Sequence, residues 1–162
     1  MKESVFTSDV IRSLKRCGAW SYKIMDSPTS WTMHITRFTA DKPCDILGMY
    51  AGRFFAIENK QIKKWTKFGL ENMRASQIRE LENITRLGGE AFVLLNVRIK
   101  ARKAKGRAKA WKHENRLIVF DWITFKNKGT YSIDELKALG FIKQELKDRK
   151  PFYDLSMFLT LL

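Results

Sequence analysis

The sequence predicts a mixed α/β fold, with helices packed against a central β-sheet. Two stretches have the helical spacing of apolar residues, and several short apolar runs have the length and alternation of strands. Of the 162 residues, 44% are hydrophobic, including 11 Phe, 5 Trp and 4 Tyr. This composition argues against intrinsic disorder, and the length suits one domain with an ordinary core. We therefore expect a single domain over residues 1–162.

An amphipathic helix is predicted over residues 5–17. Its apolar residues share the spacing of one buried stripe, and Gly18 follows as a C-terminal stop. The stripe consists of Val5, Phe6, Val10, Ile11 and Leu14. Residues 27–42 begin with turn-forming residues and continue with an alternation typical of a strand or ribbon at residues 31–36. We expect a short protruding ribbon or stalk there.

A β-hairpin is predicted by the apolar runs 46–50 and 53–57. Only Ala51 and Gly52 separate these runs, which indicates a two-residue turn with a positive φ at Gly52. With this turn the numbers of paired residues sum to 103, so Asp45 lies opposite Glu58.

The remaining predicted elements alternate between helix and strand. A helix over residues 74–87 ends at Gly88-Gly89, and its inward residues are expected to be Ile78, Leu81, Ile84 and Leu87. The continuous apolar run 91–97 is typical of a central strand buried on both faces, and a second strand is expected at 117–120. Ser132 and Glu135 form a capping-box pattern that opens a short helix ending near Gly140.

The charge of the chain indicates a polyanionic partner. Lys and Arg number 31 against 17 Asp and Glu, which gives a formal net charge of +14. Nucleic acid is the leading candidate, since the sequence has no helix with a lysine-rich face opposite a large aromatic one, as a membrane-surface protein would. The chain also lacks a long apolar run and a disulfide framework, so we expect a soluble cytoplasmic protein with no membrane partner.

Asp45, Glu58 and Lys60 form the candidate catalytic group. Opposed residues on paired strands have Cβ atoms about 4.5–5.5 Å apart, close enough for two carboxylates to hold one divalent cation. Glu58 and Lys60 point to the same strand face, so an ammonium group would accompany the two oxygen ligands. Phosphodiester hydrolysis uses this set of groups. On spacing alone, a solvated strand face at 58–60 and a turn cap at Asp45 explain the same residues equally well.

The region 43–97 resembles the RecU-type Holliday junction resolvases of the PD-(D/E)XK nuclease superfamily. The resemblance rests on Asp45 followed by Glu58-Asn59-Lys60, and on the turn Gly48-Met49-Tyr50-Ala51-Gly52-Arg53 between them. It extends to Ser76-Gln77-Ile78 and to Gly88-Gly89-Glu90-Ala91-Phe92-Val93-Leu94. It implies the PD-(D/E)XK, restriction-endonuclease-like fold, with a central mixed sheet flanked by helices.

The resemblance also implies an activity and roles for individual residues. The expected protein is a homodimeric endonuclease that cuts opposed strands of a four-way DNA junction with Mg²⁺, for which Mn²⁺ substitutes. Asp45 and Glu58 would be metal ligands and Lys60 the catalytic lysine. Gln77 would be an active-site or DNA-facing side chain, although on spacing alone it is equally well a polar residue at a helix start.

The first helix departs from the family pattern. The family tends to carry a Glu there, and matching Phe6 to the Leu or Phe of the family places Thr7 at that position. Glu3 lies one turn earlier on the same face and is the substitute metal ligand that we expect, with a frayed helix end over residues 1–3 as the alternative. The stalk of cellular members is short here, which suggests a compact, phage-encoded relative.

Basic residues around the candidate site predict DNA contacts. Residues 98–116 hold nine Lys and Arg side chains against one acid, and we expect a flexible basic arm there. The predicted DNA-binding residues are Lys63, Lys64, Lys67, Arg74, Arg102, Lys103, Lys105, Arg107 and Lys109. Two alternatives remain open: a nuclease of the same fold with another DNA substrate, and a non-catalytic nucleic-acid-binding protein.

Overall fold

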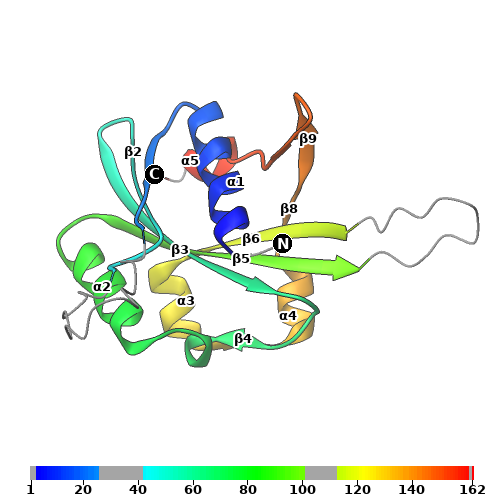
Figure 1. Ribbon diagram of the computed structural model, residues 1–162. Helices are drawn as coiled ribbons and strands as arrows, with labels where there is room; N and C mark the ends of the chain where they lie inside the picture. The colour runs from blue at the N-terminus through cyan, green and yellow to red at the C-terminus, as the bar shows by residue number, and fades with distance from the viewer. Residues whose placement is uncertain (1–2, 26–41, 101–112, 161) are drawn as a thin grey trace, which may run out of the picture.

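The computed structural model describes residues 3–25, 42–100, 113–160 and 162 (Figure 1). The chain runs through α1 (Glu3–Arg16), β1 (Trp20–Lys23), β2 (Ile46–Tyr50), β3 (Arg53–Ile62), β4 (Phe68–Gly69), a 3₁₀ turn (Leu70–Asn72), α2 (Ala75–Arg86) and β5 (Glu90–Lys100). It continues with β6 (His113–Asp121), α3 (Trp122–Lys128), β7 (Thr130–Tyr131), α4 (Ile133–Ala138), β8 (Ile142–Lys143), β9 (Glu145–Lys147), β10 (Lys150–Phe152) and α5 (Ser156–Leu159).

The expected central mixed sheet flanked by helices is confirmed. Six strands lie in the order β1-β2-β3-β5-β6-β8, and every neighbouring pair is antiparallel except the parallel pair β3–β5. Helix α2 is the crossover between these two parallel strands. In Figure 1, α1 and α5 lie on one side of the sheet, and α2, α3 and α4 lie on the other.

Each face of the sheet has its own apolar core. Phe55 and Ile57 of β3 pack with Phe6 and other residues of α1 and the C-terminal segment, whereas Ala56 packs with Leu81 of α2. This alternation assigns odd-numbered residues of β3 to the α1 face and even-numbered residues to the α2 face. The C-terminal residues that enter the α1-side core are Tyr153, Leu155, Phe158, Leu159 and Leu162.

The predicted hairpin is confirmed in its turn and its register. The pairs run from Ile46↔Ile57 to Tyr50↔Arg53, so that paired numbers sum to 103 as expected. The φ angle is +81° at Gly52 and +48° at Ala51. Both central residues are therefore left-handed, as in the type I′ turns whose twist matches that of antiparallel strands.

The other predicted elements are confirmed with changes at their ends, but the prediction that Val5 belongs to the buried stripe of α1 is wrong, because this side chain is 45% exposed. Helix α2 buries Leu81 as expected, but the prediction that Leu87 points inward is wrong, because this residue follows the last helical turn and is 77% exposed. The prediction of a flexible arm at 98–116 is wrong for residues 98–100 and 113–116, because these residues belong to β5 and β6, which pair from Phe92↔Asp121 to Lys100↔His113. The central part of the arm, 101–112, and the expected stalk, apart from Lys42 at its end, lie outside the described residues.

Three features were not predicted. Strand β1 forms one edge of the sheet, α3 follows β6 without a break, and β8 to β10 precede the C-terminal helix α5. Asp121 ends β6 and caps α3, because its Oδ1 accepts from the Thr124 N–H at 2.9 Å. No helix in the described part of the chain is long and apolar enough to cross a membrane.

Candidate functional site

The hairpin and the start of α2 bring four predicted residues together on the α2 face of the sheet. Glu58 and Lys60 are even-numbered residues of β3, and the Lys60 Nζ lies 3.3 Å from the Glu58 Oε1. The Lys60 Nζ also donates to the Gln77 Oε1 at 2.9 Å. Glu58 is 1% exposed, and Asp45, just before β2, is 7% exposed. The site is therefore a largely buried polar group at the edge of an apolar core.

Gln77 contacts three groups at once. Its Oε1 accepts from the Lys60 ammonium and from the Arg74 main-chain N–H, each at 2.9 Å, and its Nε2 donates to the Glu58 Oε1. The side chain is 3% exposed and lies in the first turn of α2. Gln77 therefore caps the helix and binds both Glu58 and Lys60, and its role in the active site stays a prediction.

Asp45 is held on both carboxylate oxygens. Its Oδ2 accepts from the Asn59 main-chain N–H at 2.9 Å, and its Oδ1 lies 2.7 Å from the Lys42 Nζ. The β2–β3 pairing ends at Ile46, but the Asp45 N–H still donates to the Ile57 carbonyl at 3.1 Å, so Asp45 continues along β3 toward Glu58. The contact of Lys42 with Asp45 was not predicted from the sequence. The available signal was the position of this lysine three residues before Asp45.

Burial and charge shift the protonation of Glu58. Burial of the carboxylate, followed by the negative charge of Asp45, raises the pKa of Glu58 to about 7. Lys60, and more weakly Lys42, oppose this shift. Burial also raises the pKa of the Cys44 thiol to about 12, so this neighbouring side chain is a neutral, apolar-like part of the core.

The Asp45–Glu58 pair fits a hard divalent cation. The Glu58 Oε2 is buried and has no hydrogen-bond partner among the described residues. Two neighbouring carboxylates and an unpartnered carboxylate oxygen are the donor chemistry that Mg²⁺ and Mn²⁺ prefer. The described residues contain no group of three metal-ligating side chains. The expected third ligand, Glu3, is the first residue of α1, and its side chain lies outside the described part of the structure.

Thr7 and Asn59 meet on the opposite face of the sheet. Asn59 is fully buried, and its Nδ2 donates to the Thr7 Oγ1 of α1 at 3.3 Å. Because the Asn59 main-chain N–H binds Asp45, this residue contacts both the carboxylate pair and α1. The sequence offered no signal for this link beyond a polar residue in an otherwise apolar strand.

The predicted DNA-binding residues divide into two sets. Lys63, Lys64, Lys67 and Arg74 are all exposed, in the segment that joins β3 to α2. The other five residues lie outside the described ranges: Arg102, Lys103, Lys105, Arg107 and Lys109. Within the first segment Trp65 is half-buried, and the Arg116 guanidinium lies 5.9 Å from the centre of its ring.

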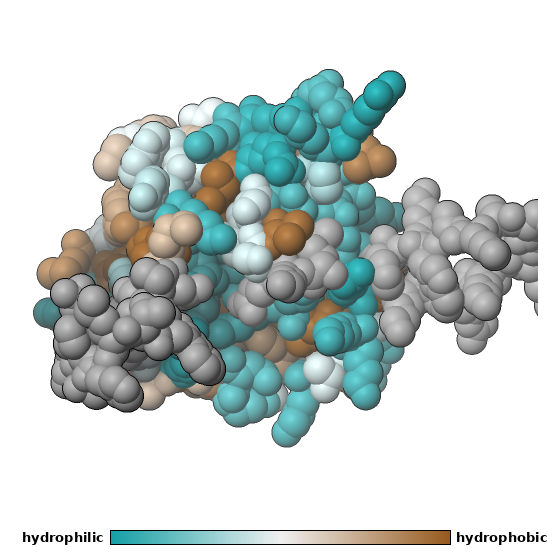
Figure 2. Space-filling model, in the orientation of Figure 1, coloured by the Kyte–Doolittle hydropathy of each residue, from teal (hydrophilic) through white to brown (hydrophobic). Residues whose placement is uncertain are grey.

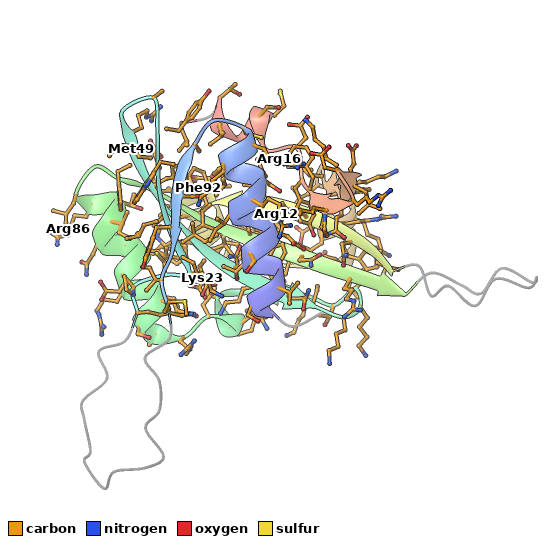
Figure 3. All side chains as sticks on the ribbon, turned by 45° about the horizontal axis from the view of Figure 1, so that its top comes forward. Arg12, Arg16, Lys23, Met49, Arg86 and Phe92 are labelled. Carbon is orange, nitrogen blue, oxygen red and sulfur yellow. The ribbon has the colours of Figure 1, made fainter. Side chains whose placement is uncertain are left out.

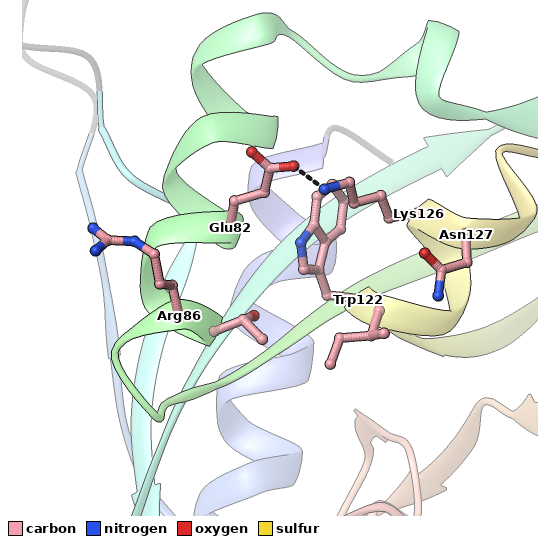
Figure 4. A pocket seen from close by; sticks show the side chains of 7 residues that line it. Glu82, Arg86, Trp122, Lys126 and Asn127 are labelled. Atoms are coloured by element: carbon pink, nitrogen blue, oxygen red, sulfur yellow. Dashed lines mark ion pairs between the residues drawn. The ribbon is translucent and has the colours of Figure 1, made fainter.

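A shallow pocket lies elsewhere, between α2 and α3 (Figure 4). It has a volume of about 410 Å³ and is bordered by Trp122, Arg86 and the ion pair of Glu82 with Lys126. Its lining residues on α2 come from the C-terminal half of the helix, whereas Gln77 lies in the first turn. The pocket is therefore separate from the carboxylate pair.

Comparison with known proteins identifies the family. A sequence model of RecU, described as Recombination protein U, matches residues 15–112, which is more than half of the chain. The chain belongs to the RecU family. The RecU match includes the hairpin, the carboxylate pair and α2, and it ends before β6.

Individual relatives match over shorter stretches. The Holliday junction resolvase RecU of Geobacillus kaustophilus (strain HTA426) is 39% identical over 51 residues, which cover 32% of this chain and 26% of the relative. The Holliday junction resolvase RecU of Bacillus pumilus (strain SAFR-032) is 32% identical over 59 residues, covering 36% and 29%. The matches thus span little more than a quarter of these relatives. Among solved structures, Hjc of Archaeoglobus fulgidus, a Holliday junction resolvase, aligns with a TM-score of 0.44 and 19% identity over 82% of this chain and 98% of Hjc.

Proposed function

We propose that this RecU-family chain is a metal-dependent endonuclease that resolves four-way (Holliday) DNA junctions. The observation that supports it most strongly is the buried pair Asp45 and Glu58 with Lys60 bonded beside them. Membership of the RecU family, whose matched relatives are named Holliday junction resolvases, supports the substrate. We place the activity in recombination and repair of DNA, in the cytoplasm of a bacterial or phage-infected cell, with residues 1–162 as a single nuclease domain.

The roles of the residues follow from their contacts. Asp45 and Glu58 would hold Mg²⁺, for which Mn²⁺ substitutes, and a bound cation of this kind polarises a phosphate and activates water. The Lys60 ammonium, held by Gln77 and Glu58, orients the attacking water and offsets the charge that develops on the phosphate. Gln77 keeps Lys60 and Glu58 in place, and the exposed cations Lys63, Lys64, Lys67 and Arg74 bind backbone phosphates beside the site.

Paired cuts require two sites, and we propose that a two-fold homodimer supplies them. An apolar patch at one end of the sheet is the surface that we assign to the interface. It contains Trp20, Tyr22, Met49 and Phe54, which are 62%, 59%, 48% and 38% exposed. Trp20 pairs with Met49, and Met49 with Phe54, so these three side chains lie side by side on one face across β1, β2 and β3. Figure 3 labels Met49 in this region.

The test is cleavage of a labelled immobile four-way junction, with a linear duplex of the same arms alongside, in Mg²⁺ and in EDTA. We expect paired symmetric nicks in the junction, an intact duplex, and no nicks in EDTA. Glu58→Gln and Asp45→Asn should abolish cutting and preserve or strengthen binding, because each removes a negative charge near phosphate. Glu82→Gln, an acid on α2 that pairs with Lys126 away from the site, is the matched control and should cut normally.

Other outcomes would contradict parts of the proposal. Equal cutting of junction and duplex would preserve the metal site but indicate a general nuclease. Tight binding without cutting in Mg²⁺ or Mn²⁺ would indicate a non-catalytic nucleic-acid-binding protein.

A further inference from the structure

A basic hairpin made of β9 and β10 lies on the α1 side of the sheet, whereas the carboxylate pair lies on the α2 face. It follows β8, beyond the residues that match the RecU family, and Figure 1 shows it projecting from the α1 side of the sheet. Its tip carries Lys147, Arg149 and Lys150, which are all exposed. In Figure 2 this corner of the molecule is strongly hydrophilic.

Arg149 and Lys150 have no ion-pair partner within the described ranges, whereas the Lys147 ammonium interacts with the Asp154 carboxylate and lies 5.3 Å from the centre of the Phe152 ring. The acid at the tip, Asp148, is bound instead by the Arg16 guanidinium of α1 at 2.6 Å. Cations on the opposite side of the sheet are neutralised within the protein: Lys126 pairs with Glu82, Lys128 with Glu135, and Lys137 with Asp134. At Arg149 and Lys150 the hairpin therefore presents cations that form no ion pair with the described residues, unlike the three lysines of the α3–α4 surface.

The hairpin is fixed to α1 by two arginines, which Figure 3 labels on that helix. The Arg16 Nη1 donates to the Lys147 carbonyl at 3.2 Å, and the Arg12 Nη1 donates to the Pro151 carbonyl at 3.3 Å. Phe152 anchors β10 because its ring is buried and faces the Arg16 guanidinium at 5.9 Å. A surface held in this way binds a partner without first ordering itself.

The turn of the hairpin has a strained backbone. Asp148 and Arg149 have φ angles of +53° and +59°, in the left-handed region that Gly and Asn adopt most easily. Glycine would fit the second turn position better than arginine. Strain that persists at an exposed position points to a use for the side chain, which here is a guanidinium at the tip.

We propose that the β9–β10 hairpin binds the phosphate backbone of duplex DNA, on the side of the sheet opposite the carboxylate pair. The inference depends on the proposed function in one respect, which is that it takes DNA as the polyanionic partner. The arms of a four-way junction leave its centre in different directions. A protein with phosphate contacts on both sides of its sheet can therefore hold one arm at the site and another at the hairpin.

The test compares two triple variants with the same charge. The hairpin variant is Lys147→Gln/Arg149→Gly/Lys150→Gln, and the control is Lys126→Gln/Lys128→Gln/Lys137→Gln. Each lowers the formal net charge by three, from +14 to +11 (14 − 3). Binding to a blunt linear duplex is measured in EDTA by fluorescence anisotropy over a range of salt concentrations.

Three lost phosphate contacts should reduce the slope of log affinity against log salt by about 2.7, at about 0.9 per contact. If the variant and the unmodified chain converge at 1 M salt, the loss of affinity at 0.1 M salt is roughly 500-fold. The control should retain the slope of the unmodified chain. An unchanged slope in the hairpin variant, or an equal loss in both variants, would overturn the proposal. Loss of binding to phosphatidylserine vesicles with unchanged duplex binding would also overturn it, in favour of a membrane partner.

The single change Arg149→Gly separates a binding role from a structural one. Because glycine relieves the positive φ, this variant should unfold at the same temperature as the unmodified chain or higher, while its duplex affinity falls. An affinity that does not fall contradicts the proposal. These measurements need neither metal nor cutting, so a chain that binds through the hairpin but cuts nothing would refute only the nuclease assignment.

Discussion

The raised pKa of Glu58 makes the stability of the metal-free protein depend on pH. The ordinary pKa of this side chain is 4.5, and burial beside Asp45 raises it to about 7. The folded protein therefore binds a proton at Glu58 that the unfolded chain releases between these values. The resulting stabilisation is complete below about pH 4.5 and is lost as the pH rises through about 7.

The size of the effect follows from the pKa difference. At 1.36 kcal/mol for each pKa unit, a rise from 4.5 to about 7 corresponds to about 3 kcal/mol of unfolding free energy. Solvent screening lowers this free energy little, because Glu58 is only 1% exposed. Glu58→Gln removes the titrating group and preserves an oxygen that accepts from the Gln77 amide. The variant should match the unmodified chain near pH 4 and exceed its stability by up to about 3 kcal/mol near pH 8.

The assay is urea unfolding in EDTA, with both proteins measured at several pH values between about 4 and 8. The difference between the two free energies cancels the contributions of groups that they share. A difference that stays constant across this range would refute the assignment of the raised pKa to Glu58. Added Mg²⁺ should stabilise the unmodified chain at high pH and leave Glu58→Gln unaffected, since a cation bound at the pair replaces the proton.

Three further substitutions test other parts of the site. Lys60→Met should lower the rate of junction cutting by about 10²- to 10³-fold while Mn²⁺ binding, measured by calorimetry, persists; a normal rate would exclude Lys60 from catalysis. Asn59→Leu should have an unfolding free energy in urea within about 1 kcal/mol of that of the unmodified chain, because the lost bond to Thr7 is offset by removal of a buried, unpartnered Oδ1. A much larger loss of stability would show that the amide is essential to the fold. Phe54→Glu should convert a dimer to a monomer by light scattering, and an unchanged mass would exclude the apolar patch as the interface.

The carboxylate site was predictable from the sequence because the hairpin specifies its own register. A two-residue turn at Ala51-Gly52 leaves one pairing of the flanking strands, and that pairing brings Asp45 next to Glu58. The strand period then assigns Glu58 and Lys60 to one face. The register and the alternation both depend on residues close together in the sequence, and the structure shows both.

Contacts between distant or irregular segments were not predictable in this way. Lys42 reaches Asp45 through the chain path before β2, which no periodic pattern describes. Strand β1 is only four residues long at an edge of the sheet, too short for a clear periodic pattern, and α3 begins directly after β6 with no intervening Gly or Pro. Gln77 was ambiguous because its role depends on how the crossover helix α2 packs over β3.

The amide of Gln77 has a direction as well as a position. Its oxygen faces two N–H donors, from Arg74 and Lys60, and its nitrogen faces the acceptor Glu58, so turning the group by 180° would lose every one of these bonds. Glutamate at this position would set a second negative charge against Glu58, and methionine would offer neither donor nor acceptor. Only a primary amide on a side chain of this length satisfies all three neighbours. The residue at position 77 and the pair Glu58 and Lys60 therefore constrain each other, and a substitution at one of these positions changes which substitutions the others accept.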